Sequence, residues 1–244
     1  MPRRRKYFDP HKASPRQKEA WVHKTFEGIS EHYDLMNDLE SFGLHRAWKR
    51  RLVKGVSALG PKTVLDVACG TGDIALEIAR KNPQAQVIGL DFSPNMLEVA
   101  RQKAGEQFAN LTFTQGSALA LPFDTGSFDA VAISFGLRNM ADYQDAIQEM
   151  VRVLRPGGCF FCLEASYPTN PLIKPLFRLY FRYLMPLMAK LVTKKTAEYR
   201  WLNDSTEAFL TKKQLLALLT TCGLTHVHYH TIALGAVALH RGKK

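Results

Sequence analysis

Strand-like apolar runs alternate with segments of helical periodicity between about residues 63 and 164. This alternation is typical of repeated βαβ units, whose strands join in one parallel sheet with helices against its faces. Two more strand-like runs, separated by a short turn, follow near the end of the chain and predict an antiparallel hairpin. The sequence therefore predicts an α/β fold. Its predicted strands span residues 63–67, 86–90, 111–115, 128–134, 158–164, 225–231 and 235–240.

Residues that favour helix ends mark several predicted helices. Ser93 before Pro94 predicts a helix start, because a serine hydroxyl can accept a hydrogen bond from a first-turn amide and proline fits that turn. Thr211 and Gln214 match the capping-box pattern of a last helix that ends at Gly223. Further helices are predicted over about residues 45–54 and 141–154, the second stopping at residues 156–158.

The net charge of +11 comes mainly from the two ends of the chain. Basic residues crowd the first 18 positions, which predicts a flexible basic head over residues 1–18, and others close the C-terminus. Residues 19–240 are nearly neutral, so we expect no nucleic-acid partner. A length of 244 residues suits one large domain over residues 19–244.

Composition also bounds the cellular setting. Four cysteines are too few for a disulfide framework in a chain of this length, which indicates a reducing compartment. No charge-free apolar run approaches the ~18 residues that a membrane-spanning helix needs, and the N-terminus lacks the apolar core of a signal peptide. We therefore expect a cytoplasmic protein with at most peripheral contact to the inner face of the cytoplasmic membrane. The oligomeric state stays open, a homo-oligomer included.

A glycine turn follows the first predicted strand and carries the clearest chemical signal. Gly70, Thr71 and Gly72 lie between an acid at the end of one strand, Asp66, and a second acid at the end of the next, Asp91. Such a turn lets a ligand approach the backbone, and a carboxylate beside it can bind ribose hydroxyls. The spacing also fits a dinucleotide fingerprint. However, Asp66 would repel a pyrophosphate, and no Tyr-x-x-x-Lys pair is present for hydride transfer. The cationic donor S-adenosylmethionine fits better.

Several longer motifs carry a resemblance to a known family. They are Tyr33–Asp38 (YDLMND), Ser41–Lys49 (SFGLHRAWK), Ile133–Asn139 (ISFGLRN), Leu154–Gly158 (LRPGG) and Val237–Gly242 (VALHRG). With the glycine turn, they make residues 22–244 similar to the class I S-adenosylmethionine-dependent methyltransferases. Among these, the chain most resembles the C-methyltransferases of ubiquinone and menaquinone biosynthesis.

The resemblance implies a fold, a reaction and a set of ligand contacts. The fold is Rossmann-like, with a mostly parallel seven-stranded sheet, a C-terminal antiparallel hairpin and helices on both faces. The implied reaction moves a methyl group from S-adenosylmethionine to a ring carbon of a polyprenylated demethylated quinol, either demethylmenaquinol or the ubiquinol precursor. The donor-binding positions that match are Thr71, Asp91, Ser117, Ala118 and Ser134. The chain departs from the family at Ser117, where Asp or Asn is usual, and at Glu40, where an apolar residue is usual.

A basic, apolar segment at about residues 167–195 lies outside the nucleotide-binding pattern. Lys174, Arg178 and Arg182 are spaced four residues apart, so a helix would place them on one face among leucines. We interpret this segment as a lid over an apolar substrate that makes transient contact with an anionic membrane surface; a core helix with solvated arginines is the alternative. The expected substrate contacts are Tyr33, Phe177, Phe181 and Tyr199.

Arg138 and Asn139 are the expected donors to the negative charge that develops on the acceptor oxygen, since both follow a strand directly. The hydroxyl proton could leave through water, His45, Tyr33 or Tyr199, and the sequence does not choose among them. No metal site is expected, because an exposed edge strand explains the alternating His226, His228 and His230. Other readings remain: a class I methyltransferase for another apolar molecule or for RNA, a non-catalytic subunit, or an NAD-dependent dehydrogenase.

Overall fold

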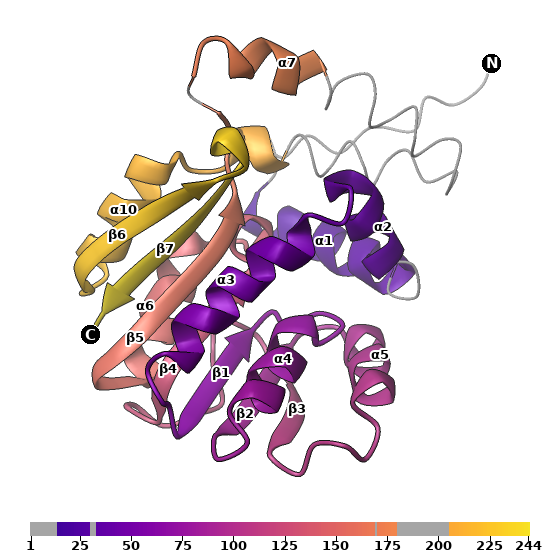
Figure 1. The fold of residues 1–244 in the computed structure, drawn as a ribbon, viewed down its shortest axis with the longest axis vertical. Helices are drawn as coiled ribbons and strands as arrows, with labels where there is room; N and C mark the ends of the chain where they lie inside the picture. Colours follow the sequence, from indigo (N-terminus) through magenta and orange to yellow (C-terminus); the bar gives the residue numbers. More distant parts are fainter. Residues whose placement is uncertain (1–13, 30–32, 169, 180–204) are drawn as a thin grey trace.

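The computed structural model describes residues 14–29, 33–168, 170–179 and 205–244. Seven strands form one sheet in the order β3-β2-β1-β4-β5-β7-β6 (Figure 1). Neighbours from β3 to β5 pair in parallel, whereas β7 is antiparallel to both β5 and β6. The predicted mostly parallel sheet with a C-terminal hairpin is confirmed. The strands are β1 (Thr63–Val67), β2 (Gln86–Asp91), β3 (Leu111–Gln115), β4 (Phe128–Ser134), β5 (Leu154–Ala165), β6 (Thr225–Ile232) and β7 (Val237–Lys243).

Helices cover both faces of the sheet and enclose two apolar cores. Leu52 of α3 (His45–Ser57) and Ile78 of α4 (Asp73–Lys81) are fully buried in the core on one face. On the other face, Ile147 of α6 (Tyr143–Val153) and Leu215 of α10 (Lys212–Thr221) belong to the second core. The sheet separates these two helical layers (Figure 1). Burial of these apolar faces is the main stabilising contribution to the fold.

Two predicted helix starts are confirmed and one boundary differs. Ser93 Oγ accepts a hydrogen bond of 3.2 Å from Met96 N at the start of α5 (Pro94–Ala104), and Thr211 with Gln214 forms the capping box of α10. The helix predicted over about residues 141–154 is α6, which ends at Val153, but β5 begins at once at Leu154 rather than at the predicted residue 158. The β4–β5 register shifts between Phe128 and Ala130, which accommodates the turn residues inside the strand.

The hairpin leaves β6 at the edge of the sheet, joined to β7 by a short 3-10 turn, η4 (Ala233–Gly235). His226, His228 and His230 are exposed on this edge strand, and the rings of the last two lie 5.7 Å apart. Within the described ranges, no group of three His, Cys, Asp or Glu side chains is placed to hold a metal ion.

Three more helices lie beside the carboxyl ends of the parallel strands: α1 (Pro15–Ile29), α2 (Tyr33–Ser41) and α7 (Ile173–Leu179). Helix α1 begins at Pro15, within the last residues of the predicted basic head, and Lys18 Nζ donates to Tyr143 Oη at 3.0 Å. The rest of the head, and the predicted lid beyond Leu179, lie outside the described residues. In the part of the chain that is described, no helix is both long and apolar enough to cross a membrane.

Strand order places a natural ligand site between β1 and β4. From β1 the chain proceeds outward to β2 and β3, whereas β4 leads in the other direction to β5. In open α/β sheets a crevice forms where the direction reverses, outside the carboxyl ends of the strands. The turns after β1, β2 and β4 all meet at this edge.

Asp66 is buried inside β1 and joins the strand to the helix that follows. Its side chain is 1% exposed, and its Oδ2 accepts a hydrogen bond of 3.1 Å from Ala75 N in the first turn of α4. Burial raises the pKa of this carboxyl to about 8, despite the opposing effect of Lys49. Asp66 is therefore largely protonated at neutral pH.

We expect the free energy of unfolding to decrease as the pH rises from about 4 to about 8. Over this range the unfolded chain releases the proton of Asp66, whereas the folded protein keeps it. The Asp66→Asn variant has no carboxyl at this position, so it lacks this pH-dependent contribution to stability. Urea unfolding of both proteins at pH 5 and pH 8 should show that the wild type loses stability relative to the variant at the higher pH. An unchanged difference between the two proteins would contradict the shifted pKa.

Candidate functional site

The glycine turn between β1 and α4 requires residues without a side chain. Gly70 and Gly72 have φ values of +55° and +83°, in the left-handed region that favours glycine. A Cβ atom on Gly72 would lie 3.0 Å from both Ala100 Cβ and the Phe113 ring. The turn thus passes close to α5 and β3 and presents its backbone at the carboxyl edge of the sheet.

Asp91 at the end of β2 ties two turns together. Its Oδ2 accepts a hydrogen bond of 2.7 Å from Gly70 N, and its Oδ1 accepts one of 3.0 Å from Ser93 N. Burial raises the pKa of Asp91, and the two backbone donors oppose that effect. Each carboxylate oxygen has a second lone pair, so the group can still bind hydroxyls of a ligand.

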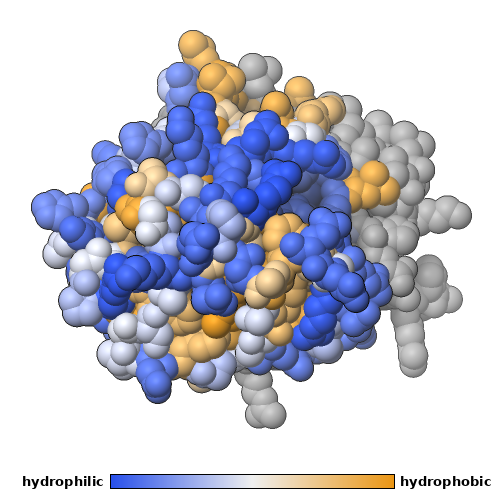
Figure 2. All heavy atoms as spheres, turned by 60° about the horizontal axis from the view of Figure 1, so that its bottom comes forward, coloured by the Kyte–Doolittle hydropathy of each residue, from blue (hydrophilic) through white to orange (hydrophobic). Residues whose placement is uncertain are grey.

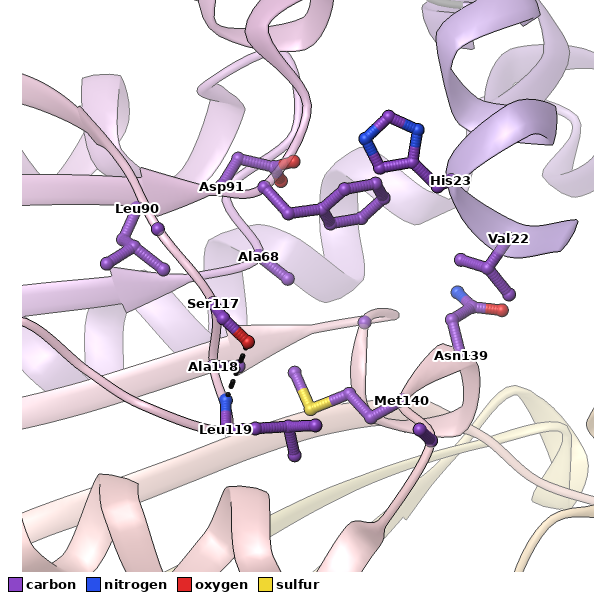
Figure 3. Close-up of a pocket in the computed structure, with 14 residues that line it drawn as sticks. Val22, His23, Ala68, Leu90, Asp91, Ser117, Ala118, Leu119, Asn139 and Met140 are labelled. Carbon is purple, nitrogen blue, oxygen red and sulfur yellow. Dashed lines mark hydrogen bonds between the residues drawn. The ribbon is translucent and has the colours of Figure 1, made fainter. Parts of the chain in front are cut away.

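A cavity of about 140 Å³, the Asp91 cavity, opens beside this carboxylate (Figure 3). Its walls combine Asp91 with apolar side chains and with the backbone of the turn after β3. Ser117 Oγ lines it and accepts a hydrogen bond of 3.2 Å from Leu119 N. An acid at one edge and flat apolar walls suit a nucleoside, with ribose on the acid and the base between the walls. Its lining includes Val22, Ala68, Phe92, Ala118, Asn139 and Met140.

Thr71, in the middle of the glycine turn, belongs to a network of charged side chains from three helices. Its Oγ1 donates to Asp34 Oδ1 of α2 at 2.7 Å and accepts from Lys103 Nζ of α5 at 2.9 Å. Lys103 also pairs with Asp34 and, at 2.9 Å, with Asp73. Burial alone would raise the pKa of Asp73, but Lys49 and Lys103 lower it to about 2. The network fixes α2 against the turn.

The segment after β4 carries a buried ion pair. Arg138, in the 3-10 turn η2 (Leu137–Asn139), donates from Nη1 to Glu164 Oε1 at 2.6 Å and from its backbone N to Glu164 Oε2 at 3.2 Å. The two residues are 6% and 1% exposed. Arg138 Nε is buried and has no hydrogen-bond partner among the described residues. A Cβ on Gly136 would lie 2.8 Å from Ala68 Cβ, so this segment packs tightly on the glycine turn.

A second cavity, of about 290 Å³, lies on the other side of residues 135–139 and is called the Trp48 cavity. Its walls are mainly apolar, and the polar or charged side chains among them are Asn37, Ser41, His45, Arg138 and Thr206. Gly136 and Asn139 line the Asp91 cavity, whereas Phe135 and Arg138 line the Trp48 cavity. One short segment therefore forms part of the wall of both. The lining includes Ser41, Phe42, Trp48, Phe177, Thr206 and Val237.

The predicted site residues named below divide into four groups. Asp91, Ser117, Ala118 and Asn139 line the Asp91 cavity, and His45, Arg138 and Phe177 line the Trp48 cavity. Ser134 is next to the segment, and its Oγ is buried without a described partner. Tyr33 lies against Gly70, on the side of the glycine turn. Phe181 and Tyr199 are outside the described residues.

Asp66 lies deeper in the sheet than the other predicted site residues. The sequence places it as a carboxylate that faces a cationic ligand, but its side chain is buried beneath the turn and is not part of the lining of either cavity. Its oxygen is used by Ala75 N, and burial keeps the carboxyl protonated. The structure shows its contact with the turn, and its contact with a donor stays a prediction.

Sequence reasoning missed the residues that reach the site from distant parts of the chain. Val22 and His23 of α1 close one side of the Asp91 cavity, and His23 lies 5.1 Å from the Phe92 ring. Glu164 was expected only as a strand residue. A buried acid at the carboxyl end of a strand was the available signal, since such an acid needs a cationic partner.

Comparison with known proteins agrees with this geometry. Residues 14–244 match the profile of the ubiE/COQ5 methyltransferase family. Proteins of Staphylococcus carnosus and Staphylococcus aureus, both named demethylmenaquinone methyltransferase, are 42% identical over 224 residues, which cover 91% of this chain and 92% of each relative.

Solved structures share the fold at low sequence identity. An S-adenosylmethionine-dependent methyltransferase from Thermotoga maritima aligns with a TM-score of 0.60 at 19% identity, over 91% of this chain and 99% of that one. The carbon methyltransferase CurJ aligns with a TM-score of 0.55 at 17% identity, over 74% of this chain and 48% of its own. The fold is that of the class I methyltransferases, and with the match over residues 14–244 this chain is a methyltransferase that belongs to the ubiE/COQ5 methyltransferase family.

Proposed function

We propose that this enzyme transfers the methyl group of S-adenosylmethionine to a ring carbon of a polyprenylated, demethylated quinol, with demethylmenaquinol as the first candidate. The wall that residues 135–139 share between the two cavities carries this proposal. Because one short segment borders both cavities, a nucleoside in one and a ring in the other would bind next to one another, as direct transfer of a methyl group requires. The names of the staphylococcal relatives support the choice of quinol.

The class I fold and the family imply S-adenosylmethionine as donor, and the residues of the Asp91 cavity fit it. Asp91 would bind the ribose hydroxyls, and Ser117 and Ala118 would border the adenine. Thr71 and the backbone of the glycine turn would contact the amino-acid end. The sulfonium supplies an electrophilic methyl group when the donor is bound. The turn and α1 position that group and exclude water from it.

The Trp48 cavity would hold the quinol ring among apolar side chains. Arg138 contributes a cation at its wall, and Glu164 keeps the guanidinium in place. Donors aimed at an oxygen that becomes negative stabilise the transition state more than the ground state. Arg138, with Asn139 beside it, would therefore favour a phenolate-like oxygen and direct electron density to the neighbouring ring carbon.

A membrane contact is the second part of the proposal. Phe42 and Leu44 line the Trp48 cavity and are 68% and 54% exposed, so they stand at its mouth. Leu172, just before α7, and Leu179, at its last position, are also exposed. An apolar rim of this kind lets a prenyl tail extend from the cavity into lipid, with Lys174 exposed nearby for anionic headgroups. Arg178 and Arg182 cannot be placed on this surface, because the structure describes neither side chain.

The position of the transferred methyl group tests the reaction. We expect the enzyme, given methyl-labelled S-adenosylmethionine and reduced demethylmenaquinol, to place the label on a ring carbon, as read by mass spectrometry and NMR of the product. Label on oxygen, or label only on RNA or another small molecule offered in parallel, would overturn the assignment.

Asp91→Ala should weaken binding of S-adenosylhomocysteine by roughly 100-fold or more, because hydrogen bonds to a charged group contribute about 1.5–3 kcal/mol each. Asp129→Ala is the matched control. Asp129 is also buried and accepts hydrogen bonds from Lys62 N and Thr63 N, but at the opposite edge of the sheet. Calorimetric titration should show normal affinity in the control, and equal affinity in both variants would exclude the ribose role.

Arg138→Met with Glu164→Gln should lower kcat by roughly 100- to 1,000-fold, the range for loss of one donor to a developing oxyanion. The double change is needed, since removing Arg138 alone leaves Glu164 buried without a cation, at a cost of about 3–5 kcal/mol. Glu164→Gln alone keeps the guanidinium but leaves it buried without its anion, so it serves as comparison only with its folding measured alongside. A folded double variant with wild-type kcat would show that Arg138 has no part in the chemistry.

A further inference from the structure

His45 lies where the apolar Trp48 cavity meets a polar groove. The groove, of about 550 Å³, is lined mainly by charged side chains of α3, α4 and α5 and is called the Lys49 groove. His45 is 5% exposed and belongs to the lining of both spaces. A hollow among hydrophilic residues is visible on the face shown in Figure 2. The side chain therefore lies between a mainly apolar cavity and a groove lined mainly by charged residues.

The hydrogen bonds around His45 determine which ring nitrogen carries the proton. Ser41 Oγ lies 2.8 Å from His45 Nδ1 and 2.6 Å from the carbonyl oxygen of Asn37. A hydroxyl has one proton, and the carbonyl can only accept, so Ser41 donates to Asn37 and accepts from Nδ1–H. Asp38 Oδ1, 3.7 Å from Nδ1, favours the same tautomer. Nε2 is then unprotonated, and none of the described residues forms a hydrogen bond with it.

Charged groups on three helices act on this imidazole. Burial and Lys49 lower its pKa, as does Arg46, whereas Asp38 on α2 and Asp73 on α4 raise it, and the net shift is downward from the usual histidine value. The ring is therefore neutral at physiological pH and able to accept a proton. The protonated form would be brief, since the groove offers water and carboxylates to take the proton onward.

We propose that His45 is the general base of the reaction: Nε2 accepts the hydroxyl proton of the quinol in the Trp48 cavity and releases it to water in the Lys49 groove, while Ser41 and Asp38 are positioning residues that hold the reactive tautomer. This inference rests on the proposed function and chooses among the proton acceptors that the sequence leaves open. Arg138 cannot fill that role, because a guanidinium stays protonated.

The proton balance is complete with this route. The hydroxyl proton moves to Nε2, the ring carbon forms a bond to the methyl group, and the sulfur–methyl bond breaks with its electron pair left on sulfur. The hydrogen displaced from the ring carbon returns as a proton to the oxygen. One proton is released overall, through the groove.

The test compares pH profiles of kcat at saturating S-adenosylmethionine with a short-prenyl quinol. The wild type should lose activity at low pH as His45 becomes protonated. His45→Gln should lose roughly 100- to 10,000-fold in kcat, the usual contribution of a general base, and should lack this acid limb. His228→Gln, an exposed edge-strand histidine, should behave as wild type.

Variants of Asp38 and Ser41 distinguish positioning of His45 from a purely structural role, because a structural role would leave the pH of the acid limb unchanged. Asp38→Asn removes a charge that raises the pKa of His45, so the acid limb should move to lower pH. Ser41→Ala should lower kcat with little change in KM. Added imidazole should partly restore turnover of His45→Ala through the groove.

Three results would overturn the inference: wild-type kcat in His45→Gln, an acid limb that stays in that variant, or a limb unmoved by Asp38→Asn. Product analysis separates this failure from failure of the proposed function. If label still reaches the ring carbon in the wild type, only the base is misassigned, whereas absence of labelled quinol refutes the function itself.

Discussion

The buried pair of Arg138 and Glu164 fixes the segment that separates the two cavities. Two charges removed from water are costly unless hydrogen bonds satisfy them, and Glu164 accepts both the guanidinium and the backbone N–H of Arg138. Glu164 belongs to β5, and Arg138 directly follows the neighbouring strand β4. The pair therefore attaches the dividing wall to the rigid sheet, and the positions of both proposed ligands depend on it.

The donor side is organised by the same edge of the sheet. Asp91 connects the turn after β1 with the turn after β2, while the charges around Thr71 hold α2 against them. Helix α2 also carries Asp38 and Ser41, which contact His45. One helix thus reaches both the glycine turn and the proposed base. Placement of donor, acceptor and proton acceptor follows from contacts among neighbouring elements.

Local sequence signals predicted most of the sheet. The strands over residues 111–115 and 128–134 were placed correctly, because breakers bound each apolar run. Asp91 and Ser117 could be placed together, since carboxyl ends of neighbouring parallel strands share an edge. The start of β5 was missed because proline and glycines at 156–158 signal a stop locally, while pairing with β4 continues the strand. The complete burial of Asp66 could not be predicted, because burial depth is a property of the packed sheet.

Contacts between segments that are distant in the sequence could not be predicted. Nothing near Val22 or Lys18 in the sequence indicates that α1 borders the Asp91 cavity, and the pairing of Glu164 with Arg138 spans 26 residues. The proton state of His45 likewise depends on Asp73 from another helix. Such features come from tertiary packing, which periodicity and motif spacing do not encode.

A crystal structure with S-adenosylhomocysteine and a short-prenyl quinol analogue tests the central claim most directly. The account predicts ribose on Asp91, adenine beside Ser117, and the quinol in the Trp48 cavity, with its oxygen within hydrogen-bond reach of Arg138 and its ring carbon in contact with the donor's methyl position. A quinol ring bound away from the Trp48 cavity, or with residues 135–139 between it and the donor, would contradict it.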